Sequence, residues 1–131
     1  MKTYITVHAI ATNNKSEYLV LQRANNRTSP AKWNCVTGYI KDRESAEEAA
    51  LRELKEETNL TGEIIKTTEP FWIDDKEVRW LVVTSLIKVE DASELQINEH
   101  ESQNYKWIKA SDPIVDQSKG LKTSLSKLGI I

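Results

Sequence analysis

The most constraining feature of this chain is an acidic stretch from Gly38 to Leu60, GYIKDRESAEEAALRELKEETNL. Ser45 followed by Glu48 fits a capping box, so the stretch predicts a helix with Ser45 as its N-cap and Ala46 as its first residue. Asn59 fits the left-handed position just past the last turn, because asparagine tolerates positive φ better than other non-glycine residues. The predicted helix has about three and a half turns.

Three carboxylates share one side of this predicted helix. At about 100° per residue, Glu53, Glu56 and Glu57 fall within an arc of about 100°, beside small apolar residues at the edge of the buried face. Like charges at this spacing repel and destabilise a helix. A hard cation among them resolves the conflict, since Mg²⁺ takes oxygen ligands and few of them from protein. The alternative is a solvated face, which a helix rich in Glu, Lys and Arg usually presents.

The same stretch resembles the Nudix box, G-x5-E-x7-R-E-U-x-E-E-x-G-U, in which U is an apolar residue. Gly38, Glu44 and the run from Arg52 to Leu60 match every fixed position except the last glycine. The chain departs from the family at three places where glycine is usual: Thr37, Arg43 and Asn59. A motif with many fixed positions at fixed spacing is specific, so the chain is identified as similar to Nudix hydrolases.

The resemblance implies an α/β fold, a Nudix-type α/β/α sandwich with a mixed β-sheet, formed as a single domain over residues 1–131. The sequence taken in order is consistent with it. Strands are predicted at 4–10, 17–22, 33–37, 63–66, 71–73, 78–89 and 105–108, with a hairpin joining the first two and another around 74–77. Residues 80–83 read as a central strand buried on both faces. Ser111, Asp112 and Pro113 predict a helix start with proline in the first turn, and 118–128 predicts a last amphipathic helix.

Composition limits the classes of partner. The chain has 131 residues and a formal net charge of −2, which gives no basic footprint for duplex nucleic acid. Its one cysteine, Cys35, lies in an apolar run and reads as a small buried side chain. No apolar run approaches the length of about 18 residues that spans a membrane. We expect a cytoplasmic protein that binds no membrane and acts as a monomer or homodimer.

The resemblance also implies roles for individual residues in a pyrophosphohydrolase that depends on Mg²⁺ or Mn²⁺. The implied metal ligands are Glu53, Glu56, Glu57, Glu101 and the carbonyl of Thr37. The implied catalytic residues are Arg52, Glu53, Glu56 and Glu101, with Glu44 as an outer partner of Arg52. The family varies in which glutamate takes the proton from water, and the sequence leaves that choice open.

Glu101 is preferred to Glu99 as the late-chain carboxylate. It stands six residues before Trp107, a spacing that resembles the family pattern Glu-x5-Trp. A glutamate on a mobile loop is expected to close over metal and water once substrate is bound. Both acids are otherwise ordinary loop carboxylates.

Substrate-binding residues are less sharply defined. Arg23 and Arg27 are candidate phosphate clamps, and Gly38 allows the backbone to approach a ligand closely. Trp33 is the preferred stacking surface for a planar ring, although most aromatic side chains of a small domain lie in the core. The other aromatic candidates are Phe71, Trp72, Trp80, Tyr105 and Trp107.

The sequence predicts cleavage of a phosphoanhydride bond in a nucleoside triphosphate or a related small molecule. Trp33 with Val36-Thr37-Gly38, and Glu101 with Tyr105-Lys106-Trp107, resemble the dihydroneopterin triphosphate pyrophosphatase branch of the family. The alternatives are a nucleotide-sanitising triphosphatase, a hydrolase of dinucleoside polyphosphates or nucleotide sugars, and a Nudix-fold module that binds nucleotides without turnover.

Overall fold

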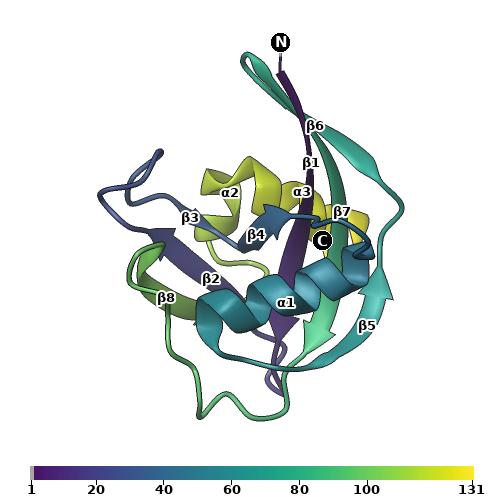
Figure 1. The fold of residues 1–131 in the computed structure, drawn as a ribbon. Helices are drawn as coiled ribbons and strands as arrows, with labels where there is room; N and C mark the ends of the chain where they lie inside the picture. Colours follow the sequence, from purple (N-terminus) through teal and green to yellow (C-terminus); the bar gives the residue numbers. More distant parts are fainter. Residues whose placement is uncertain (1) are drawn as a thin grey trace.

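The computed structural model describes residues 2–131 (Figure 1), and within them the chain forms eight strands and three helices. The strands are β1 (Lys2–Thr12), β2 (Tyr18–Arg23), β3 (Trp33–Asn34), β4 (Val36–Tyr39), β5 (Glu63–Thr67), β6 (Phe71–Asp75), β7 (Val78–Lys88) and β8 (Ser102–Ile108). The helices are α1 (Ala46–Thr58), α2 (Ile114–Gln117) and α3 (Lys119–Lys127).

The sheet is mixed and divides into two parts. Strands β1 and β7 run parallel side by side over eleven residues, from Lys2↔Val78 to Thr12↔Lys88. Strand β4 adds antiparallel to β1, while β5 and β6 add antiparallel to β7. Strand β2 leaves β1 directly after the pair Thr12↔Tyr18 and takes β3 and β8 as its partners instead. The expected hairpin between the first two strands therefore exists only at its turn, because β7 and β4 occupy the two edges of β1.

Helices cover both faces of this sheet (Figure 1). Helix α1 crosses one face, where Ala50 and Leu54 pack into a core that includes Leu19 and Ile87. Helices α2 and α3 cover the other face, and α3 packs its apolar side there through Leu121, Leu125 and Leu128, as its sequence pattern predicts. The fold is the expected α/β sandwich with a mixed sheet.

The boundaries predicted for α1 are confirmed. Ser45 accepts a hydrogen bond from the N–H of Glu48, and the Glu48 side chain accepts one from the N–H of Ser45. Asn59 closes the helix in the left-handed region, with φ 63° and ψ 10°. Arg43, another of the replaced glycines, also takes positive φ, at 62°. Both substitutions keep a backbone conformation that glycine adopts most readily.

Three predictions about local structure need correction. Residues 33–37 form two strands, because the Asn34 side chain accepts the N–H of Cys35 and the chain then moves from β2 to β1. Residues 80–83 are central but not buried on both faces. The cross-strand neighbours of Leu81 are Ile5 on β1 and Trp72 on β6, which are 55% and 48% exposed, so this face of the sheet is open to solvent there. Pro113 occupies the N-cap of α2, one position before its first turn.

All helices in the described part of the chain are too short or too polar to span a lipid bilayer.

Candidate active site

A cleft of about 890 Å³ opens beside the carboxylate face of α1. Its wall is built from both parts of the sheet, from α1, and from the segment that joins α2 to α3. Among the residues singled out from the sequence, the lining includes Arg23, Arg27, Trp33, Thr37, Gly38, Glu53, Glu56, Glu57 and Glu101. Segments far apart in the chain therefore meet at one site, whereas Arg52 and Glu44 are not among its lining residues.

Arg52 donates hydrogen bonds to four partners around the acidic face, the surface formed by Glu53, Glu56, Glu57 and Glu101. Its Nε and Nη2 donate to the two carboxylate oxygens of Glu44, at 2.7 and 2.9 Å. Its Nη1 donates to Glu53 at 2.8 Å and to Glu56 at 3.2 Å, and Nη2 also reaches the Tyr39 carbonyl at 2.9 Å. The hydrogen bonds from Arg52 hold the pKa of Glu44 down at about 2, and those to the carboxylates raise the pKa of Arg52. Every donor of this guanidinium is used, which fixes Glu53 in place.

Gly38 is required where it stands, because it faces the Glu53 carboxyl group. A Cβ at this position would collide with the Glu53 side chain. The Gly38 carbonyl accepts a hydrogen bond of 2.7 Å from the Thr6 hydroxyl, which anchors the strand beneath the helix. Burial raises the pKa of Glu53, and the Arg52 hydrogen bond opposes that shift. The absence of a side chain at Gly38 thus allows the Glu53 carboxyl group to pack directly against the main chain of β4 in the cleft.

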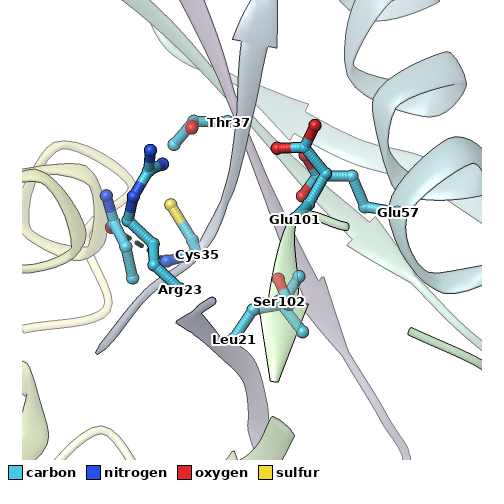
Figure 2. Close-up of a pocket in the computed structure, with 8 residues that line it drawn as sticks. Leu21, Arg23, Cys35, Thr37, Glu57, Glu101 and Ser102 are labelled. Carbon is cyan, nitrogen blue, oxygen red and sulfur yellow. Dashed lines mark hydrogen bonds between the residues drawn. The ribbon is translucent and has the colours of Figure 1, made fainter. Parts of the chain in front are cut away.

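Glu57 and Glu101 form the second half of the acidic face (Figure 2). Burial, followed by the charges of Glu53 and Glu101, raises the pKa of Glu57 to about 8. Within residues 2–131, no hydrogen bond or ion pair holds the Glu57 carboxylate, and only the charges of Arg23 and Arg27, whose effects are the smallest, oppose the rise in its pKa. A half-buried carboxyl group without a partner is costly unless something brought into the cleft compensates it.

The cationic side of the cleft carries both predicted arginines. Arg27 Nη2 lies 3.0 Å from a carboxylate oxygen of Glu101. Arg23 donates from Nε to the Thr28 carbonyl at 2.6 Å and from Nη2 to the Thr28 hydroxyl at 3.1 Å, so it also holds the 24–32 loop. Lys41, which the sequence reading did not select, approaches Glu56 at 3.9 Å. These side chains offer phosphate groups several positive partners next to the carboxylates.

The loop that presents Glu101 is docked onto the end of α1 through main-chain hydrogen bonds, and its closure over bound substrate stays a prediction. Its Asn98 donates a main-chain N–H to the Glu57 carbonyl at 3.0 Å, and the Asn98 carbonyl then accepts the N–H of Glu101 at 2.9 Å. The Glu101 carbonyl accepts the N–H of Ala24 at 3.0 Å. Glu101 lies in the cleft, whereas Glu99 is exposed and outside it.

The aromatic candidates divide between the cleft, the core and the outer surface. Trp33 lines the cleft on the β2–β3 side, with the Lys106 ammonium 5.0 Å from its ring centre. Trp80 lines it on the β1–β7 side, where the Tyr4 ring lies 5.2 Å from Trp80 and 6.2 Å from Tyr39. Phe71 and Trp107 belong to the core, while Trp72 and Tyr105 are exposed away from the cleft.

Tyr39 is a site residue that the sequence reading missed. Tyr39 is 55% exposed, lines the cleft, and comes directly after Gly38 in the chain. Its place next to the motif glycine was the one available signal. The neighbouring rings come from strands 35 and 41 residues away along the chain, so no local pattern predicted the group.

The carboxylates fit a hard divalent cation by their chemistry. In the described part of the chain, no three acidic, histidine or cysteine side chains converge closely enough to enclose an ion. Glu53 and Glu56 are instead turned toward Arg52, as the contacts above describe. The donors at the cleft are nevertheless all oxygens, and Glu57 has no other positive partner, which is the environment that Mg²⁺ or Mn²⁺ favours.

A second buried ionisable group lies on the α3 side of the cleft. His8 Nδ1 is 2.8 Å from the Ser124 hydroxyl, which is itself 2.8 Å from the Thr84 hydroxyl. Burial lowers the pKa of His8 to about 4, although the Gly120 backbone opposes the shift. Cys35 is 4% exposed, and burial raises the pKa of its thiol, so it is the buried side chain that the sequence predicts.

Comparisons with known proteins agree with this architecture. The family model described as the NUDIX domain matches residues 2–127. The bis(5'-nucleosyl)-tetraphosphatase [asymmetrical] of Caenorhabditis elegans is 32% identical over 104 residues, which cover 76% of this chain and 72% of that protein.

Solved structures are similar over most of the chain. A MutT protein from Methanosarcina mazei Go1 has a TM-score of 0.71 at 26% identity, covering 82% of this chain and 78% of that one. An Ap4A hydrolase binary complex from C. elegans has a TM-score of 0.71 at 24% identity, covering 98% and 96%. A NUDIX hydrolase from Nitrosomonas europaea has a TM-score of 0.77 at 19% identity, covering 98% and 89%. With the motif at its cleft and the family match over nearly its whole length, the chain belongs to the Nudix family of hydrolases, which act on phosphoanhydrides.

Proposed function

We propose that this Nudix hydrolase cleaves dinucleoside polyphosphates in a reaction that depends on a divalent metal ion. The observation that carries the substrate class is the cleft itself, whose lining includes aromatic side chains from both parts of the sheet as well as the carboxylates. Trp33 lies in one part, and Trp80 with Tyr39 lies in the other. Stacking platforms in both parts suit a molecule with a base at each end. The tetraphosphatase relative supports the same class.

The carboxylates of Glu53, Glu56, Glu57 and Glu101 are the groups that would hold the metal, with the Thr37 carbonyl beside them. When bound, a divalent ion neutralises phosphate oxygens and lowers the pKa of its coordinated water. Arg52 keeps Glu53 and Glu56 oriented through its bonds of 2.8 and 3.2 Å. The protein thus supplies a fixed acidic side for the reaction.

The substrate phosphates would bind between this acidic side and the cations opposite. Arg27 and Arg23 lie on that side, while Lys41 lies beside Glu56, 3.9 Å from its carboxylate, within the same cleft. A phosphate that takes over Arg27 would release Glu101 from its ion pair of 3.0 Å. Glu101 would then accept the proton of the attacking water, a role suited to a carboxylate within hydrogen-bond reach. Water adds to one phosphorus, the P–O–P bond breaks, and two phosphorylated nucleosides leave.

A substrate panel tests this proposal directly. Diadenosine tetraphosphate, ATP, dihydroneopterin triphosphate and a nucleotide sugar are each incubated with Mg²⁺, and the products are separated by chromatography. We expect the highest kcat/KM for diadenosine tetraphosphate, with ATP and AMP as products. A higher kcat/KM for ATP or dihydroneopterin triphosphate would show that the proposed substrate class is wrong. Binding without any turnover would show that the protein is a nucleotide-binding module and no hydrolase.

The aromatic surfaces offer a sharper version of the test. Trp80→Ala removes one platform and leaves the carboxylates and arginines untouched, so it should raise KM for the dinucleotide more than for a mononucleotide. Trp72→Ala is the matched control, because Trp72 is 48% exposed but lies outside the cleft. An equal effect of Trp80→Ala on both substrates would contradict a site with two bases.

A further inference from the structure

The asparagine that replaces the motif glycine makes a contact that glycine cannot make. Asn59 takes φ 63° and donates its main-chain N–H to the Lys55 carbonyl at 2.9 Å, and a glycine would do both. Its side chain goes further: Nδ2 donates to the Glu94 carbonyl at 3.1 Å, across 35 residues of sequence. Glu94 belongs to the loop 90–101, which ends at Glu101. The departure from the motif therefore links the end of α1 to the loop that presents the late carboxylate.

This loop is attached to the end of α1 in reverse order, so that later loop residues meet earlier helix residues. Main-chain N–H groups of Gln96 and Asn98 donate to the carbonyls of Thr58 and Glu57, at 2.9 and 3.0 Å. Leu95 and Ile97 pack against the core on the α1 side of the sheet. The Asn59–Glu94 bond adds an attachment at the exposed beginning of the segment, before these contacts start. Only this attachment depends on the identity of the side chain at position 59.

We propose that Asn59 is a positioning residue for Glu101: its carboxamide fixes the loop 90–101 to the end of α1 and so sets Glu101 opposite Glu57. The inference rests on the proposed role of Glu101 in catalysis. Glu57 belongs to the helix and Glu101 to the loop, so the separation of their carboxylates depends on how the two segments are docked. Small errors in the placement of a catalytic group reduce turnover strongly. Because the main-chain bonds remain, removing the carboxamide should loosen the loop without undocking it.

The test is a double-mutant cycle with Asn59→Gly and Glu101→Gln, assayed with saturating Mg²⁺ and diadenosine tetraphosphate. Asn59→Gly keeps the left-handed backbone and removes only the clamp. We expect kcat to fall about three- to tenfold with KM within about twofold of the parent, because the loss concerns alignment in the reacting complex. In the Glu101→Gln background the same change should cost nothing further. Equal losses in both backgrounds, or full activity of Asn59→Gly, would overturn the proposal.

Asn59→Asp provides the matched variant. Aspartate has nearly the same shape and also tolerates positive φ, but its carboxylate cannot donate to the Glu94 carbonyl. It should therefore behave like glycine at this position, and parent-like kcat for Asn59→Asp would contradict a role for the donated hydrogen bond.

Hydrogen exchange separates this inference from the proposed function. Asn59→Gly should speed amide exchange at residues 94–98 while the amides of α1 keep their protection. If exchange in the loop is unchanged, the clamp does not exist in solution and the proposal fails. If Glu101→Gln alone is as active as the parent, the proposed role of Glu101 is wrong, and the positioning role of Asn59 is wrong with it. The substrate panel still reports on the proposed function in that case.

Discussion

His8, which is buried, and Glu57, which is half-buried, are both ionisable side chains beside the same cleft, and the two differ in whether the fold gives them a partner. His8 is 5% exposed and is hydrogen-bonded into a chain of hydroxyl groups on α3 and β7. Burial lowers its pKa to about 4, so it is neutral near pH 7. Glu57 has a pKa raised to about 8, with two further carboxylates near it. One group is satisfied within the fold, and the other is not.

Whether a side chain beside the cleft has a hydrogen-bond partner indicates whether it serves the stability of the fold or the function of the site. Buried polar groups are normally hydrogen-bonded, and a satisfied network stabilises a single arrangement of the core. A perturbed group without a partner inside a cleft is instead the kind that active sites retain. His8 should therefore matter for stability, and Glu57 should matter for turnover. The interpretation would be contradicted if substitution of His8 mainly reduced turnover and substitution of Glu57 mainly reduced stability.

The largest effect is expected from Glu57→Gln. The change keeps volume and removes the carboxylate that would ionise to hold a metal ion, so turnover with Mg²⁺ should fall at least about a hundredfold. In EDTA the parent should be inactive, and the variant should unfold at the same temperature or higher because an uncompensated carboxyl group is gone. Glu63→Gln, an exposed carboxylate on β5, is the control and should change neither property. Full activity of the parent in EDTA would contradict metal dependence.

Acid should destabilise the fold through His8. Its folded-state pKa of about 4 lies below the ordinary 6.5, so its stabilisation is complete above about pH 6.5 and is lost as pH falls through about 4. We expect the His8 contribution to the free energy of unfolding to fall by about 2 kcal/mol between pH 7 and pH 5, whereas protonation of Glu57, whose pKa is raised, acts in the opposite direction. Urea unfolding measured across this range tests it.

Matched histidine variants identify the source of that loss. In His8→Gln the free energy of unfolding should be lower near pH 7 and should fall less between pH 7 and pH 5 than in the parent. His100→Gln alters an exposed loop residue and should leave the pH dependence of the parent unchanged. If His8→Gln keeps the pH dependence of the parent, another group causes the loss.

Glu101→Gln and Glu99→Gln compare two loop acids two residues apart. Glu101 lies in the cleft beside Glu57, and Glu99 is exposed outside it. Glu101→Gln should lower kcat tenfold or more, on the usual scale for loss of a general base or a ligand. Glu99→Gln should do little under the same saturating Mg²⁺. If both variants match the parent, the base lies within α1.

What the sequence predicts well is what local chemistry determines. The boundaries of α1 follow from Ser45 and Asn59, and the shared face of its carboxylates follows from helical spacing. The satisfied state of His8 was not predictable, since Ser124 is 116 residues away. The same holds for the departure of β2 from β1, because the competing partner β7 comes much later in the chain. Contacts between residues far apart in the chain therefore determine which ionisable side chains are hydrogen-bonded in the fold and which are not.

The smallest effect concerns a third kind of charge, the exposed pair of Arg27 and Glu101. Their side chains are 41% and 33% exposed, so Arg27→Gln should change the free energy of unfolding by less than about 0.5 kcal/mol. Lys122→Gln breaks a similarly exposed pair with Asp116 outside the cleft and should have an equally small effect on stability. Only Arg27→Gln should raise KM, by several-fold, with kcat nearly unchanged, because Arg27 would meet substrate phosphate in the ground state and transition state alike. A fall in kcat without a rise in KM would assign Arg27 to the placement of Glu101 instead of phosphate binding.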